Sequence, residues 1–81
     1  MMKSFRYTKS GIASWDSAAI TAARNQVISN LATALSMDQS AILFTYRTNY
    51  ILVRVHGTYP VNGDATVATT MTNLGYSLYS A

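Results

Sequence analysis

The alternation of two hydrophobic periods is the feature that most limits the folds open to this chain. Apolar side chains recur at every second residue in four segments, which is the spacing of strands with one buried face. These segments are 3–8, 41–47, 50–56 and 76–80. Between them, 16–36 and 64–74 carry apolar residues at the spacing of amphipathic helices. The sequence therefore predicts the order strand, helix, strand, strand, helix, strand.

This order is similar to the βαββαβ motif of ferredoxin-like two-layer sandwiches, and the similarity covers nearly the whole chain. The predicted fold class is α+β, with a four-stranded antiparallel sheet in the order 4-1-3-2 and both helices on one face. We expect a single domain over 1–81, because a chain this short cannot build two independent cores. The fold hosts many unrelated functions, so the resemblance implies none by itself.

The first helix is predicted from one apolar stripe and from polar residues at its start. Ser14, Asp16 and Ser17 are its candidate N-caps, and Trp15 is placed to fix the start of the helix onto the core. The stripe consists of Ile20, Ala23, Val27, Leu31, Ala34 and Leu35.

The second helix is shorter and rich in threonine, so packing must stabilise it. Asp64 is its predicted N-cap, and Gly75 is expected to follow its last turn. Val67, Met71 and Leu74 form its apolar stripe.

Across both helices and the sheet, the residues expected to be nearly fully buried are Val27, Leu31, Phe44, Val53 and Met71. Thr48-Asn49 is predicted to close a tight hairpin between the middle strands.

Composition excludes several classes of protein. The chain is 49% hydrophobic, which predicts a folded domain, and only 11% charged, so its polar surface is built mainly from uncharged residues. The net charge of +3 reflects scarce acidic residues, since there are three Asp and no Glu. No cysteine is present to form a disulfide or a thiolate site. The first residues lack a signal-peptide pattern and no apolar run is long enough to cross a membrane, so we expect a cytoplasmic protein without membrane contact.

Chemistry-bearing residues are few. Asp16 and Asp64 fit helix starts and Asp38 fits a turn, which leaves no paired carboxylates for acid–base catalysis. His56 has no further metal ligands nearby in the sequence, and no glycine-rich phosphate loop occurs. We therefore expect no enzyme, no catalytic residue, no metal and no cofactor. An enzyme on this fold would have to work with His56, tyrosine or arginine alone.

The strand pattern predicts one candidate binding surface. If the aliphatic sides of the strands face the helices, the other side of the sheet presents basic, aromatic and apolar groups together. The predicted binding residues are Arg6, Arg47, Tyr50, Leu52, Arg54, His56 and Tyr79.

The expected function is a small non-enzymatic interaction module, and three interpretations of its surface stay open. We rank first a protein interface, in a homodimer or larger homo-oligomer or with a protein partner, through Leu43, Leu52 and Tyr50. A solvated face without partner ranks second. Binding of single-stranded nucleic acid ranks third, because three arginines are few for tight backbone contact. A small accessory or inhibitory protein of a virus or mobile element also fits the short length.

The third strand does not match the RNA-recognition motif of nucleic-acid-binding sandwiches. That motif requires a glycine and stacking aromatic residues at set positions of this strand, whereas the segment here reads YILVRVHG. Function by that analogy is not supported.

Overall fold

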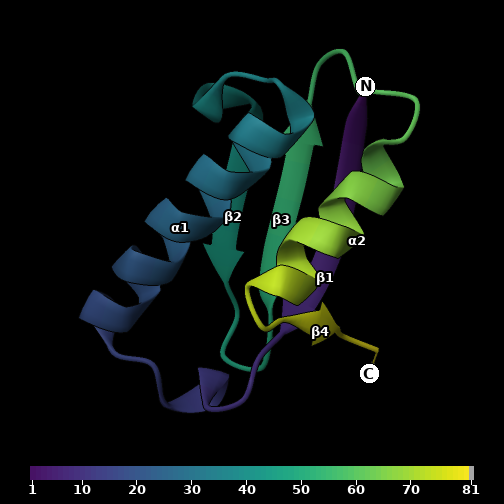
Figure 1. The fold of residues 1–81 in the computed structure, drawn as a ribbon. Coiled ribbons are helices and arrows are strands. Elements are labelled where there is room, and N and C mark those ends of the chain that lie inside the picture. The colour runs from purple at the N-terminus through teal and green to yellow at the C-terminus, as the bar shows by residue number, and fades with distance from the viewer. Residues whose placement is uncertain (81) are drawn as a thin grey trace.

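The computed structural model describes residues 1–80 and contains two helices and four strands in the expected order (Figure 1). The elements are β1 (Met2–Thr8), α1 (Ser17–Leu35), β2 (Ile42–Tyr46), β3 (Ile51–His56), α2 (Gly63–Asn73) and β4 (Ser77–Leu78). Two short 3₁₀ helices, Ile12–Ser14 and Gln39–Ala41, lie in the connections before α1 and β2.

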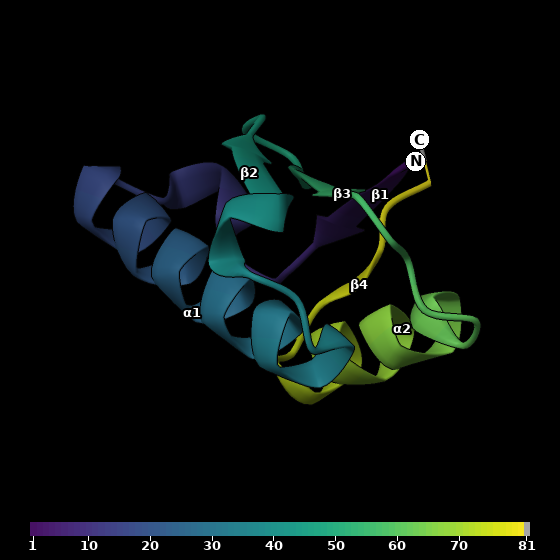
Figure 2. The same ribbon diagram turned by 90° about the horizontal axis from the view of Figure 1, so that it is seen from above.

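All four strands form one antiparallel sheet in the order β2-β3-β1-β4. Read from the other edge, this order is β4-β1-β3-β2. Both helices lie on the same side of the sheet (Figure 2), which confirms the predicted α+β two-layer sandwich. The fourth strand is shorter than the predicted 76–80, because only Ser77 and Leu78 pair with β1.

The core lies between the sheet and the helices. Val27, Leu31, Val53 and Met71 are 0% exposed, as the sequence predicts. The prediction that Phe44 is nearly fully buried was wrong, because its side chain is only partly buried. Phe44 lies on the edge strand β2, which has a neighbouring strand on one side only, so less of its ring is covered.

Helix α1 begins and ends close to the predicted residues. Its N-cap is Asp16, whose carboxylate accepts a hydrogen bond from the Ala19 amide at 2.8 Å. Its buried stripe differs from the predicted one, because Ala34 is exposed whereas Ile28 and Ala32 are buried. Since α1 contacts both β2 and α2, the face it buries extends further around the helix than a single stripe.

Helix α2 buries Val67 and Met71 and is followed by Gly75, whose φ of +91° is the left-handed conformation that favours glycine. The prediction that Asp64 is the N-cap was wrong. The N-cap is Asn62, and Asp64 lies in the first turn with its carboxylate turned toward Tyr59 and Lys3.

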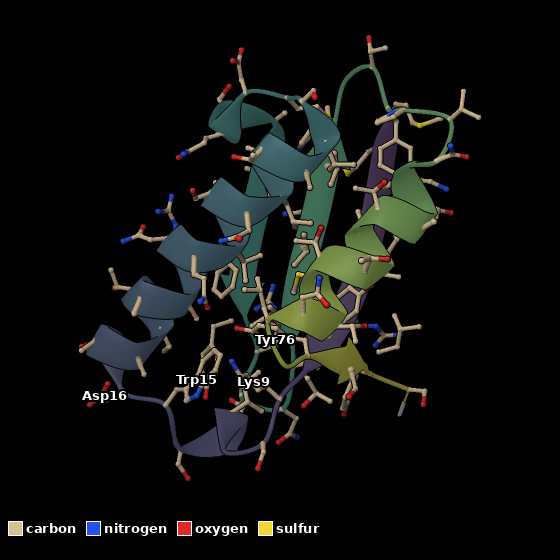
Figure 3. All side chains as sticks on the ribbon, in the orientation of Figure 1. Lys9, Trp15, Asp16 and Tyr76 are labelled. Carbon is tan, nitrogen blue, oxygen red and sulfur yellow. The ribbon has the colours of Figure 1, made fainter. Side chains whose placement is uncertain are left out.

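An aromatic cluster closes the end of the sandwich where α1 begins (Figure 3). The Trp15 ring stacks on Tyr46 at 5.9 Å and meets the edge of Tyr76 at 6.5 Å between centroids, which confirms the predicted packing of Trp15. Lys9 donates to the Leu74 carbonyl at 2.8 Å, and its ammonium lies 4.8 Å from the centre of the Tyr76 ring. Lys9 thereby satisfies a carbonyl at the end of α2 while it covers the cluster.

The β2–β3 hairpin is tight, as predicted, but it contains a strained residue. The Arg47 amide donates to the Tyr50 carbonyl at 2.8 Å, which leaves Thr48 and Asn49 as the turn. Thr48 has a φ of +60°, in the left-handed region that a β-branched residue rarely adopts. The sequence signal for this hairpin was weak because a residue suited to that conformation is missing.

We expect Leu31→Ala to lower the free energy of unfolding by about 2–5 kcal/mol, because it removes a fully buried side chain and leaves a cavity. Chemical denaturation monitored by circular dichroism measures the change. Leu78→Ala is the matched control, since Leu78 is 66% exposed and its truncation should cost less than about 0.5 kcal/mol. Equal losses in the two variants would contradict the assigned core.

We expect Thr48→Asn to raise the free energy of unfolding by about 1 kcal/mol, because asparagine tolerates the left-handed conformation better than threonine. Thr58→Asn is the control, since Thr58 is an exposed loop residue without a positive φ. A stabilisation of both variants, or of neither, would show that strain at Thr48 does not limit stability.

Candidate functional site

The candidate site is the side of the sheet away from the helices, called here the open face. Residues directly opposite each other in an antiparallel sheet share a face, so the register assigns them. Arg6 lies opposite Leu52, and Arg54 lies between Ser4 and Leu43. The open face consists of Met2, Ser4, Arg6, Thr8, Leu43, Thr45, Arg47, Tyr50, Leu52, Arg54, His56, Ser77 and Tyr79.

All seven predicted binding residues therefore lie on one face, but they are not gathered at one point. Arg6, Tyr50 and Tyr79 are in contact with one another, whereas His56 lies at the far end of β3 opposite Met2. Met2 and Ser4 were missed as members of this face. The two-residue alternation that assigns Arg6 to this face also assigns Met2 and Ser4 to it, when the alternation is extended toward the N-terminus.

Two tyrosines form the aromatic centre of the open face. The Tyr50 and Tyr79 rings are stacked with centroids 4.7 Å apart and planes inclined by 23°. The Arg6 guanidinium carbon lies 5.4 Å from the centre of the Tyr50 ring, within the range of a cation–π contact. Because β1 separates β3 from β4, both side chains lean over β1 to meet.

The arginines of the open face have no acidic neighbours. None of the three aspartates lies on a strand: Asp16 precedes α1, Asp38 precedes the second 3₁₀ helix, and Asp64 lies in α2. Within residues 1–80, the ion pair between Lys3 and Asp64 is the only one. Arg6, Arg47 and Arg54 therefore present positive charge that no carboxylate of residues 1–80 neutralises.

Arg54 is held in an unusual way at the centre of this face. Its Nε–H group is buried and finds no hydrogen-bond partner among the described residues. A buried donor without a partner costs free energy, so this group does not stabilise the side chain in the position it occupies. The Arg54 side chain as a whole is partly buried and belongs to the open face.

The apolar part of the open face is smaller than the sequence suggests. Leu52 and Tyr50 are both partly buried, and the Tyr50 ring is in contact with Tyr79 and Arg6. The large apolar residues that remain exposed there are Leu43 at 39% and Met2 at 50%. They lie on different strands, with β3 between them, so they do not form a continuous apolar patch.

Other parts of the molecule offer less chemistry. Within the described chain, no three His, Cys, Asp or Glu side chains come together as metal ligands. Neither helix of residues 1–80 has the length and apolar character that a membrane span requires. A groove beside β2 is lined by Arg24, Asn25 and Gln39 among others, and it brings no second titratable group to Arg24.

Tyr59, Asp64 and Lys3 form a polar cluster that the sequence did not reveal. The Tyr59 hydroxyl donates to Asp64 at 2.7 Å, and Lys3 Nζ lies 3.4 Å from the other carboxylate oxygen. The Tyr59 hydrogen bond, and then Lys3, lower the pKa of Asp64 below its ordinary value of 3.8. Burial, together with this bond, strongly raises the pKa of Tyr59. The cluster ties the start of α2 to β1, so its role is structural.

Comparison of the chain with protein-family models, curated proteins and solved structures finds no match. The function is therefore inferred from the chemistry of the open face.

We expect Asp64→Asn to lower the free energy of unfolding at neutral pH. We also expect the free energy of unfolding of this variant to change less than that of the wild type as the pH falls into the acidic range. A carboxyl group whose pKa is lowered by folding contributes stability above its ordinary pKa of 3.8, and the contribution is lost as the pH falls through the folded value. Denaturation midpoints measured between neutral pH and this acidic range check the expectation. Asp38→Asn is the control, because that side chain makes no capping hydrogen bond. Parallel pH profiles for the wild type and Asp64→Asn would contradict it.

Proposed function

We propose that this protein is a non-enzymatic binding module whose open face takes single-stranded nucleic acid. The observation that carries the proposal is the combination of three arginines free of carboxylates with an aromatic stack on the same sheet face. Positive charge attracts the phosphate backbone, and aromatic rings accept unpaired bases without regard to sequence.

The arrangement of the arginines suits an extended strand. Arg54 lies opposite Ser4, and Arg6 lies two residues further along β1, so the Cα atoms of the two arginines are offset by roughly 7 Å along the strands. Arg47 lies near the hairpin, on the same side as Tyr50. The charges therefore follow the length of the sheet, with the aromatic pair beside them, as a polymer with regularly spaced anionic groups requires.

Single strands fit better than a duplex. The bases of a duplex are stacked on each other and cannot reach aromatic side chains on a sheet, whereas unpaired bases can. Three arginines also provide too few backbone contacts for strong binding to a rigid duplex. The Tyr50–Tyr79 stack shows that this face accommodates parallel aromatic rings.

Self-association through this face receives less support than the sequence suggested. Leu52 is partly covered, and Leu43 and Met2 are separated exposed residues. A second copy would bring its own three arginines against those of the first, without acidic residues on either face. Like charges brought together in an interface are unfavourable. An anionic polymer reduces the repulsion among the arginines of the open face, whereas a second copy of the chain increases it.

We expect weak, salt-sensitive binding of a fluorescent oligodeoxythymidine about 12 nucleotides long, a length that one small domain can cover. Fluorescence anisotropy measures the association constant. The logarithm of this constant plotted against the logarithm of the salt concentration should have a slope of about −2, if three phosphates are contacted. Arg47→Ala and Arg54→Ala should each reduce this slope by about 0.7.

Arg24→Ala is the matched control, because it removes the same charge from the exposed surface of α1 and should leave the slope unchanged. Polyglutamate of similar length tests the aromatic part, since it offers charge without bases and should bind more weakly. The proposal fails if the wild type does not bind at low salt or if all three arginine variants behave alike. A dimeric mass by light scattering, without oligonucleotide binding, would restore the protein-interface interpretation.

A further inference from the structure

The residues of the last segment of the described chain differ strongly in how far they are buried. Tyr76 is almost completely buried in the core, whereas Ser77, Leu78 and Ser80 are exposed. Strand β4 has only two residues. Among residues 77–80, Tyr79 is therefore the one whose side chain packs against the rest of the molecule.

Tyr79 is held by two contacts on the open face. Its ring lies on the Tyr50 ring, and its backbone amide donates to the Arg6 carbonyl at 2.9 Å. Arg6 also places its guanidinium against the Tyr50 ring. The position on Tyr50 is thus a stacking site bordered by a cation, and in this structure an aromatic ring of the same chain fills it.

We infer that Tyr79 occupies the position of a nucleobase, and that binding of a single strand replaces the Tyr79 ring with an unpaired base on Tyr50. This inference rests on the proposed function and names the stacking site within the open face. A base offers Tyr50 a flat aromatic surface of the same kind, and its phosphate adds an attraction to Arg6 that a tyrosine cannot supply.

The exchange leaves the core intact. Tyr76 anchors the chain before β4, so release of 77–80 breaks the few hydrogen bonds of a short edge strand while Tyr76 itself stays in the core. Only molecules in which Tyr79 is displaced offer a free Tyr50 ring. The observed affinity is therefore the intrinsic affinity multiplied by the fraction of molecules in which Tyr79 is displaced. Removal of the Tyr79 ring should remove this reduction.

Tyr79→Ala should therefore bind the oligodeoxythymidine more tightly than the wild type, by about threefold to tenfold, which corresponds to the strength of one aromatic stack. Leu78→Ala is the control, because its side chain belongs to the same short strand, is 66% exposed and makes no aromatic stack. Its affinity should equal that of the wild type. Weaker or unchanged binding by Tyr79→Ala would show that Tyr79 supports the ligand or takes no part, and would overturn the inference.

A second measurement needs no substitution. The Tyr79 amide of the wild type should exchange its hydrogen faster when the oligonucleotide is bound, because its hydrogen bond to Arg6 is released. Slower or unchanged exchange in the saturated complex overturns the inference, whatever the stability of the variant. Binding by the wild type with either of these contrary results leaves the proposed function standing. Absence of binding by the wild type at low salt defeats the proposed function itself.

Discussion

The burial of the aliphatic side of β3 is the interaction on which the rest of the structure depends. Ile51, Val53 and Val55 are at most 1% exposed and lie beneath the two helices. Strand β3 is the neighbour of both β1 and β2, so its register sets the register of the sheet on either side. A shift of one residue would move every one of these side chains to solvent, which is why the pairing is well determined.

The same constraint creates the open face. Since side chains alternate along a strand, the burial of every second residue of β3 turns Leu52, Arg54 and His56 to the other side. Arg6 follows by its pairing with Leu52. The positive character of the face then depends on where the acidic residues lie. With only three aspartates in the chain, all placed in or next to helices, no acidic side chain is left for the sheet.

The end of the chain connects the two sides of the sheet. Tyr76 completes the aromatic cluster around Trp15 within the core, and burial raises the pKa of its hydroxyl, which has no hydrogen-bond partner among residues 1–80. Three residues later, Tyr79 lies on the opposite side against Tyr50. The segment between them is exposed and has only two paired residues, so few contacts link Tyr76 in the core to Tyr79 on the open face. We therefore expect that the surface contact can change while the fold is kept.

The sequence by itself determined the order of the elements, the start of α1 to within Ser14–Ser17, the left-handed glycine after α2 and the side of the sheet to which each predicted binding residue belongs. These features follow from short-range periods and capping chemistry, which a single chain displays directly. Tertiary structure decided the rest. Which of Ile28, Ala32 and Ala34 is buried depends on how α1 packs against both β2 and α2, and the partial exposure of Phe44 depends on β2 being an edge strand. The bonding of Asp64 to Tyr59 and Lys3, and the stacking of Tyr79 on Tyr50 across β1, join residues far apart in the chain. No local pattern encodes such contacts, because they exist only once the strands and helices have packed.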